Sequence, residues 1–301
     1  MLAAASPGQG EEPASLDNLR RDCERAIAEL AADSDHASII ALKEIAKSNP
    51  ELLREHSDEL FDLLLNVRQS NRSKCEILLL LSQIDAAHHA TPDQIKTVRG
   101  KAQSEDTFLD AYAGLLLCHR ADTYAVGMEV LTRQLSSDIP QARWVAAWVV
   151  GSIPEVPEDV LQLLEDRLED ADVTVRTYAA EAYAKHGGDA SKATAVLNSV
   201  LRSPGQACYV LPPHVSDFDL SNRAIAMGIL TKLCPAGQEP ISDVAALARS
   251  SDAQEQSVAL QTLTKWKRAE ELESISKDES VSPFYRHIAR RLVDDINTPN
   301  R

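Results

Sequence analysis

Long apolar stretches and a secretion signal are missing from this sequence. Apolar runs such as Ile77–Leu81 are far shorter than the roughly 20 residues that a membrane-spanning helix needs. The first fifteen residues, MLAAASPGQGEEPAS, have neither the positively charged start nor the long apolar core of a signal peptide. We therefore expect a cytoplasmic protein with no membrane partner and with a flexible N-terminal leader over residues 1–15.

Cysteine is too sparse and too scattered for a disulfide framework. The five cysteines are odd in number and widely spaced, at Cys23, Cys75, Cys118, Cys208 and Cys234. Structural zinc sites draw on closely spaced cysteine or histidine pairs, which these positions do not provide. We expect reduced thiols, as in a reducing cytosol.

Basic residues are in deficit. The chain has 46 acidic against 31 basic residues, a net charge of −15. Nucleic-acid binding by phosphate neutralisation needs clustered lysine and arginine, and the sequence has no such cluster. We therefore expect no nucleic-acid partner. Residues 155–172 carry eight acidic side chains and one arginine, which we interpret as the solvated face and turn of one helix.

Catalytic motifs are absent as well. The sequence contains no phosphate-binding loop, no nucleophile motif and no zinc-ligand spacing. The His88–His89 pair is interpreted as part of an exposed loop rather than as a metal site. We expect no cofactor and no bound metal.

The sequence does contain a repeated helical pattern, clearest between Leu163 and Gly188. Leucines at helical spacing predict a first helix, and a Glu-Asp-Ala-Asp run then interrupts them. Apolar residues return on one face of a second helix at Val173, Val175, Tyr178, Ala179, Ala182 and Tyr183. Two glycines end this helix because glycine accepts the left-handed backbone conformation just past a helix end. The stretch predicts one helix-turn-helix module.

The same pattern recurs along the chain when Arg176 serves as an index, with apolar residues three, four and seven places later. Index positions 36, 36, 33, 33, 47, 33 and 30 residues apart fall at Ser38, Lys74, Asp110, Arg143, Arg176, Arg223, Gln256 and Arg286. A single helix pair cannot bury its apolar face, so such modules occur in arrays. The spacing predicts about eight stacked helix pairs.

A leucine-rich first helix, an acidic turn and then Val175-Arg176 with Ala179-Ala180 resembles the HEAT repeat. This resemblance implies an all-α solenoid, an α-α superhelix of about eight HEAT-like helix pairs. In such repeats an aspartate six residues before the index arginine often joins a polar ladder between units. Asp170 with Arg176 and Asp217 with Arg223 keep this spacing, so the resemblance assigns these four residues to a structural ladder.

We expect one domain over residues 16–296 and a short tail over residues 297–301. Prolines mark the boundaries between helices, and Asn49-Pro50, Thr91-Pro92 and Ser282-Pro283 predict capped helix starts. Proline avoids the predicted helix interiors, where it would break the hydrogen-bond ladder. The chain is expected to be a monomer.

The step of 47 residues places an insertion at 203–220 between two helices. Insertions in repeat arrays often lie on the binding face, so Tyr209, His214 and Phe218 are candidate contacts to a partner. An alternative is that these side chains only cover neighbouring helix ends. A metal site formed by Cys208, His214, Asp217 and Asp219 is a further alternative, although their spacing matches no known motif.

The second helices of HEAT-like arrays generally line the concave side. Positions one and five after the index are apolar in three consecutive units, and they include Leu79, Leu115, Trp144 and Trp148. If they face outward, they form a protein-binding groove with two tryptophan anchors. If the face is rotated by one residue, they are ordinary core between repeats.

These observations favour a scaffold that binds a protein partner on its concave face and has no catalysis of its own. The alternative is a HEAT-like enzyme of the bilin lyase type or of the DNA glycosylase type. A glycosylase would use Asp138 with Trp144 and Trp148, but the net charge argues against it. The iron-dependent deoxyhypusine hydroxylases do not fit, because none of the eight histidines is followed by glutamate.

Overall fold

A computed structural model describes residues 16–32, 36–65, 69–104, 106–205, 221–235 and 237–298. Over these residues the chain is all-helical, with seventeen α-helices, two short 3-10 helices and no β-strand. The all-α prediction is therefore confirmed for the described part of the chain. By its internal contacts the chain divides into two compact units, residues 1–124 (unit 1) and residues 125–301 (unit 2).

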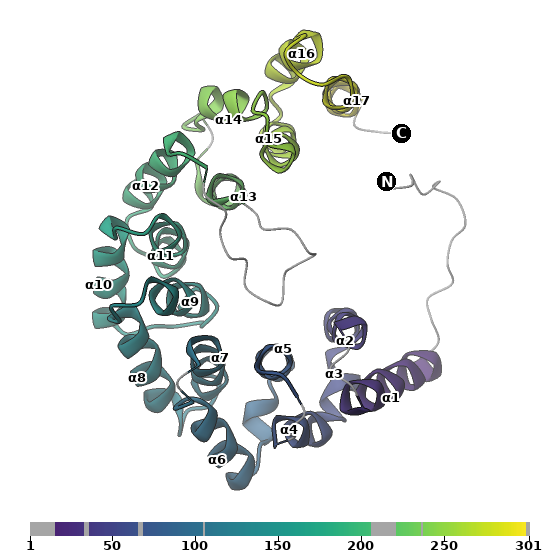
Figure 1. Cartoon of the computed structure of the whole chain (residues 1–301), viewed down its shortest axis with the longest axis vertical. Helices are drawn as coiled ribbons and strands as arrows, with labels where there is room; N and C mark the ends of the chain where they lie inside the picture. Colours follow the sequence, from purple (N-terminus) through teal and green to yellow (C-terminus); the bar gives the residue numbers. More distant parts are fainter. Residues whose placement is uncertain are drawn as a thin grey trace. The chain divides into compact units, whose positions relative to one another are not determined.

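Unit 1 consists of two layers of helices. Its elements are α1 (Leu16–Ala32), α2 (His36–Ser48), α3 (Pro50–Arg54), α4 (Ser57–Leu65), α5 (Asn71–Gln83), η1 (Ala86–His89), α6 (Pro92–Lys101) and α7 (Thr107–Cys118). In the second-helix layer, α5 packs against both α2 and α7. The other layer contains the first helix of each pair. Here α1 packs on α2, α4 on α5 and α6 on α7, whereas α1, α4 and α6 contact one another less closely (Figure 1).

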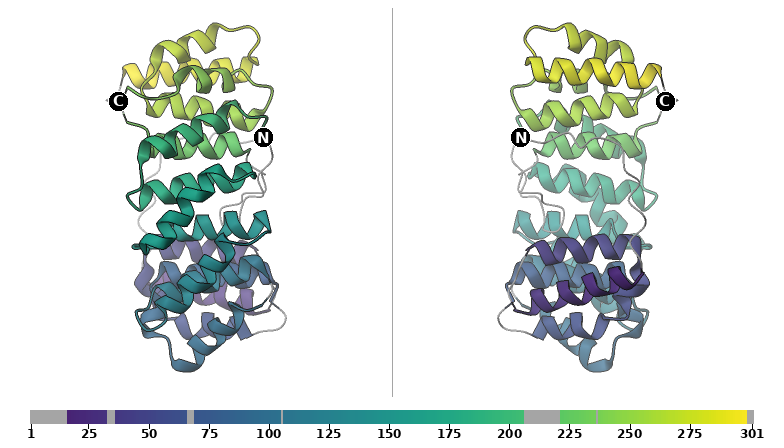
Figure 2. Two further views of the ribbon diagram at one scale, coloured as in Figure 1. Left: turned by 90° about the vertical axis from the view of Figure 1, so that its left-hand side faces the viewer. Right: turned by 90° about the vertical axis from the view of Figure 1, so that its right-hand side faces the viewer.

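Unit 2 repeats the same arrangement. Its elements are α8 (Tyr124–Leu135), which starts at the boundary, α9 (Pro140–Val150), α10 (Glu158–Asp166), η2 (Arg167–Glu169), α11 (Val173–Lys185), α12 (Ala190–Arg202), α13 (Asn222–Leu233), α14 (Ile241–Leu247), α15 (Ala253–Lys265), α16 (Ala269–Lys277) and α17 (Pro283–Asn297). Helices α9, α11, α13 and α15 contact one another in that order. Helices α10, α12, α14 and α16 each pack on the helix that follows, and Figure 2 shows the resulting stack.

The helix starts predicted from proline are confirmed. Asn49 caps α3 through its side chain, with Pro50 at the first helical position. Thr91 and Gln94 form a reciprocal capping box at the start of α6, followed by Pro92. At the start of α17 the Ser282 side chain accepts from the amide of Tyr285, and Pro283 follows at the first helical position. A side-chain cap satisfies an amide that the helix itself leaves unpaired, typically worth about 1 kcal/mol.

The register of the repeats is visible in which side chains are buried. In the second helices α5, α9, α11, α13 and α15, the residues three, four and seven places after the index are all buried. In α2 of unit 1 and α17 of unit 2 the same positions include exposed residues, Ala41 and Arg290. The triplets therefore form the core between successive helix pairs.

The end of α11 follows the glycine rule. Gly187 has a φ of +84°, and the amide of Gly188 donates to the carbonyl of Tyr183 at 2.9 Å. A hydrogen bond to the carbonyl five residues earlier is typical of a helix that ends with a glycine in the left-handed conformation.

We predict that Gly188→Ala destabilises the protein by about 1–3 kcal/mol, as overpacking in a filled core does. A Cβ at this position would lie 2.5 Å from the ring of Tyr183, which is buried and cannot easily move aside. The control is Gly228→Ala in α13, where a Cβ meets nothing within 4 Å and a gain of about 0.5–1 kcal/mol is expected. Urea unfolding followed by circular dichroism measures the free energy of unfolding of both variants. Equal midpoints for Gly188→Ala and Gly228→Ala would contradict the prediction.

Candidate functional site

The apolar patch expected on the second helices is not an exposed surface. Leu79, Leu115 and Trp144 are buried, with exposed fractions of 5, 1 and 4 %, and Trp148 is half-buried. The outward orientation expected for the first three is wrong. They belong to the packing of the helices, which was the alternative interpretation of the pattern.

The reason is that the second helices are covered on nearly every side. In α7, which has twelve residues, ten are buried, and α5 buries ten of its thirteen. A helix surrounded in this way is apolar around most of its circumference, so an apolar position does not identify an exposed face. Trp144 stacks on Tyr178 of α11, with ring centroids 5.7 Å apart. Its indole is thereby part of the contact between two repeats.

Asp170 makes a polar contact between neighbouring helix pairs, as the ladder predicts. Asp170 accepts hydrogen bonds from Arg143 Nε at 2.7 Å and Nη2 at 2.8 Å, one helix pair earlier, and from Arg167 at 3.3 Å. Arg176 donates to the main-chain carbonyls of Asp170 and Ala171. Arg143 makes the same kind of turn bonds, to the carbonyls of Ser137 and Asp138, and binds the Asp170 carboxylate as well.

A similar contact occurs near the insertion. Arg223 donates to the carbonyl of Ser203 at 2.6 Å and lies 3.4 Å from the carboxylate of Glu255. Asp217, the other aspartate that the resemblance assigns to the ladder, lies outside the described residues. So do the candidate contacts of the insertion, Tyr209, His214 and Phe218, and the alternative metal ligands Cys208 and Asp219.

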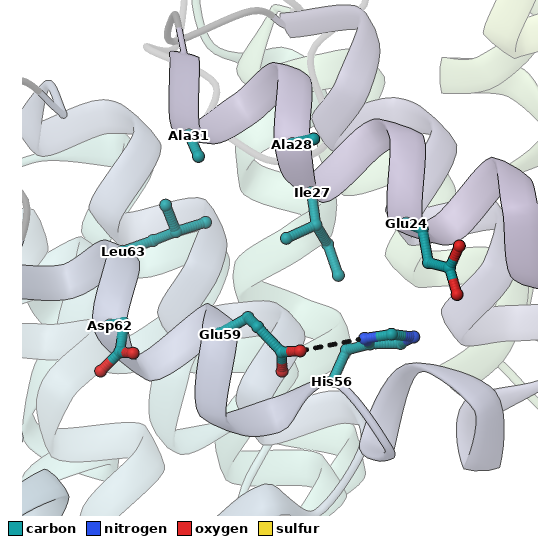
Figure 3. A pocket seen from close by; sticks show the side chains of 8 residues that line it. All are labelled: Glu24, Ile27, Ala28, Ala31, His56, Glu59, Asp62 and Leu63. Carbon is teal, nitrogen blue, oxygen red and sulfur yellow. Dashed lines mark hydrogen bonds and ion pairs between the residues drawn. The ribbon is translucent and has the colours of Figure 1, made fainter.

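The structure shows instead a groove in unit 1, between α1 and α4 of the first-helix layer. Its cavity volume is about 410 Å³, and its lining is Glu24, Ile27, Ala28, Ala31, His56, Glu59, Asp62 and Leu63 (Figure 3). Ligand pockets commonly have about 300–1,000 Å³, so the groove has room for side chains of a partner. We call it the α1–α4 groove.

The floor of this groove is apolar and its rim is acidic. Ile27 and Leu63 approach each other from the two helices, with the small side chains of Ala28 and Ala31 beside them (Figure 3). Glu24, Glu59 and Asp62 are exposed at the rim. The groove is therefore complementary to a ligand whose apolar side chains are flanked by positive charges.

His56 lies at one end of the groove, in the turn between α3 and α4. Its Nδ1 is 3.4 Å from Glu59 Oε1, and its side chain is 17 % exposed. Its Nε2 is buried and has no hydrogen-bond partner among the described residues.

The negative rim also acts on a neighbouring thiol. Burial, together with the charges of Glu24, Glu59 and Glu55, raises the pKa of Cys23 to about 11. The thiolate is the reactive form of cysteine, so Cys23 is chemically inert at neutral pH.

We predict that at most two of the five thiols react with Ellman's reagent at pH 8 in the folded protein. Burial raises the pKa of Cys118 to about 12, and raises the pKa of Cys75 as well. Cys75, Cys118 and Cys23 are buried free thiols. All five should react once guanidinium chloride unfolds the chain. Three or more fast thiols in the native protein would contradict the burial of these side chains.

No protein-family model matches the chain, and no curated protein matches it by sequence similarity. Over the described residues, no three histidine, cysteine, aspartate or glutamate side chains are arranged to hold a metal ion. None of the helices in this part of the chain is long and apolar enough to cross a membrane.

Proposed function

We propose that the chain is a HEAT-like repeat protein whose helix pairs form a solenoid, and that it functions by binding another protein. The recurring contacts of the index arginines support the repeat assignment. Arg143 donates to the carbonyls of Ser137 and Asp138, six and five residues before it. Arg176 makes the equivalent pair of bonds one repeat later. One turn geometry is thus used twice, as expected of a repeated module.

The partner binds in the α1–α4 groove in this proposal, not on the second helices. The observation that carries it is a cavity of about 410 Å³ lined by the exposed Ala28 and Ala31, with the largely buried Ile27 and Leu63 as its apolar floor. On the second helices the tryptophan Trp144 is already used in packing, so it is not available as an anchor. Apolar anchors that enter a pocket provide most of the binding energy in protein interfaces.

A selection experiment tests this proposal. The full chain is immobilised and a display library of helical peptides is selected against it, with the Ala28→Trp variant as the competitor that lacks the groove. The expected result is a set of binders that compete with one another and lose affinity for Ala28→Trp. Binders that recognise the variant as well as the wild type would overturn the assignment of the groove.

Neither enzyme alternative gains an observation in its favour. In a glycosylase site Trp144 would stack on a base, whereas here it stacks on Tyr178. The carbonyl of Asp138 accepts a hydrogen bond from Arg143 as part of the repeat turn. We therefore propose no catalytic function.

A further inference from the structure

The two walls of the α1–α4 groove differ in chemistry. On the α1 wall, Ala28 and Ala31 are exposed and small, so a partner can approach the helix closely. On the α4 wall, Glu59 and Asp62 are exposed and lie one turn apart (Figure 3). A ligand of this groove therefore meets methyl groups on one side and carboxylates on the other.

Three arginines of α1 and α3 are paired with acidic groups outside the groove, and a fourth, Arg21, donates to Asn18 and to the carbonyl of Asp17. Arg20 pairs with Glu55 at 3.0 Å, and Arg25 pairs with Asp22 at 2.7 Å. Arg54 pairs with Glu51 and also donates to the carbonyl of Ile84.

The rim carboxylates, by contrast, are left without cations. Within the described residues neither Glu24 nor Asp62 has an ion pair, and Glu59 contacts only His56. Three carboxylates thus face one apolar groove without compensating charge. Such an arrangement attracts a positively charged partner and repels a negative one.

The dimensions of the groove fit a helix. Its lining covers residues 24–31 on one side and 56–63 on the other, which is about two helical turns or 10 Å. A helix laid between two helices presents side chains at intervals of three and four residues to the floor. An alanine wall permits the short distance between helix axes that such packing requires.

We propose that the occupant of the α1–α4 groove is a cationic amphipathic helix of another protein. Its apolar side chains contact Ile27 and Leu63, and lysine or arginine along one flank faces Glu59 and Asp62. This inference rests on the proposed function, because it names the chemistry of the partner that binds in the same groove.

The test uses three synthetic helical peptides with one leucine stripe and with lysine, glutamine or glutamate along one flank. Fluorescence anisotropy measures their binding to the full chain. We expect the lysine peptide to bind about tenfold more tightly than the glutamine peptide, and the glutamate peptide to bind most weakly. The differences should shrink as salt is raised, because salt screens exposed charges.

Variants with neutral side chains test whether Glu59 and Asp62 cause the preference for the lysine peptide. Glu59→Gln with Asp62→Asn should bring the lysine peptide to within about twofold of the glutamine peptide. The matched control is Asp166→Asn with Glu169→Gln in unit 2, which removes the same charge from another exposed acidic stretch. This control should leave the preference for lysine unchanged.

The possible outcomes separate the inference from the proposed function. Equal binding of all three peptides, blocked by Ala28→Trp, would overturn the cationic partner and keep the groove. Binding unaffected by Ala28→Trp would overturn the groove itself. If the control variant Asp166→Asn with Glu169→Gln loses the preference for the lysine peptide to the same extent, the effect comes from the overall negative charge, and the inference is contradicted. If light scattering shows the chain associating with itself, and Ala28→Trp abolishes this, the occupant is a second copy and the inference is overturned.

Discussion

Replacing Asp170 with alanine is expected to destabilise the protein by about 3–5 kcal/mol, the usual cost of removing one partner from a buried ion pair. The Asp170 side chain is 2 % exposed and the Arg143 side chain 10 %. The two are joined by two hydrogen bonds at 2.7 and 2.8 Å. Alanine leaves the buried Arg143 guanidinium without the carboxylate to which it donates two hydrogen bonds. The amide of Asp172, which also donates to this carboxylate, loses its acceptor too.

The loss should depend on pH in a definite direction. Burial alone would raise the pKa of Asp170, but hydrogen bonds from Arg143 and the Asp172 amide, with the arginine charge, outweigh it and lower the pKa below 3.8. A carboxyl group with a depressed pKa stabilises the folded state above its unfolded pKa, and loses this contribution as pH falls through the folded pKa. The difference between wild type and Asp170→Ala should therefore be complete at pH 7, begin to shrink below about pH 3.8, and reach its minimum only below the lowered pKa of folded Asp170.

Asp166→Ala is the control for this experiment. It removes a charge from the same acidic stretch, but from an exposed position. Its effect on the free energy of unfolding should be below about 0.5 kcal/mol. Urea titrations of the three proteins at pH 7 measure the difference. Similar stabilities for Asp170→Ala and Asp166→Ala would mean that the Arg143–Asp170 pair does not hold the repeats together.

Filling the α1–α4 groove is the second change with a large expected effect. Ala28→Trp should weaken a groove-bound peptide at least about thirtyfold, or 2 kcal/mol, as loss of a central anchor does. The reason is steric, because Ala28 is exposed on the groove wall and an indole from this position occupies the space above Ile27 and Leu63. The fold should persist, because the substitution adds atoms only to a solvent-filled space.

Ala195→Trp in α12 is the matched control for this change. Ala195 is also an exposed helical alanine, but it lies in unit 2 and does not line the groove. Anisotropy titrations with one labelled peptide compare the two variants with the wild type. An affinity retained in Ala28→Trp, or lost equally in Ala195→Trp, would contradict binding in the groove.

Much of the helical architecture could be predicted from the sequence, because it depends on local chemistry. The Asn49-Pro50 and Thr91-Pro92 starts follow from which residues can supply a missing hydrogen bond at a helix end. The buried triplets after each index follow from the 3.6-residue period. These signals need no knowledge of what surrounds each helix.

The exposure of the second helices could not be predicted in the same way. Leu79 and Trp144 occupy the positions that were expected to face outward, yet they are buried. Periodicity finds the side of a helix that is most apolar, but it does not say how many other sides are covered by neighbours. For Asp170, the spacing predicted a place in a ladder between neighbouring units, and the structure gives Arg143 of the preceding helix pair as its partner.

The α1–α4 groove was not predicted, because the resemblance to HEAT-like arrays placed the expected binding surface on the second helices. A weak signal was present in the sequence of α1, where Ala28 and Ala31 occupy exposed positions that usually carry polar side chains. The acidic residues of α4, Glu59 and Asp62, carry no motif that sets them apart from other exposed helical carboxylates. Only the placement of α1 beside α4 shows that these features border one cavity.

The most direct test of a protein-binding groove in unit 1 is a methyl NMR titration of the full chain with the lysine-flanked peptide. We expect shift changes at the methyl groups of Ile27, Ala28, Ala31 and Leu63, and none at Leu79 or Leu115. Changes that avoid these four groove residues, and that concentrate on the second helices instead, would contradict the account.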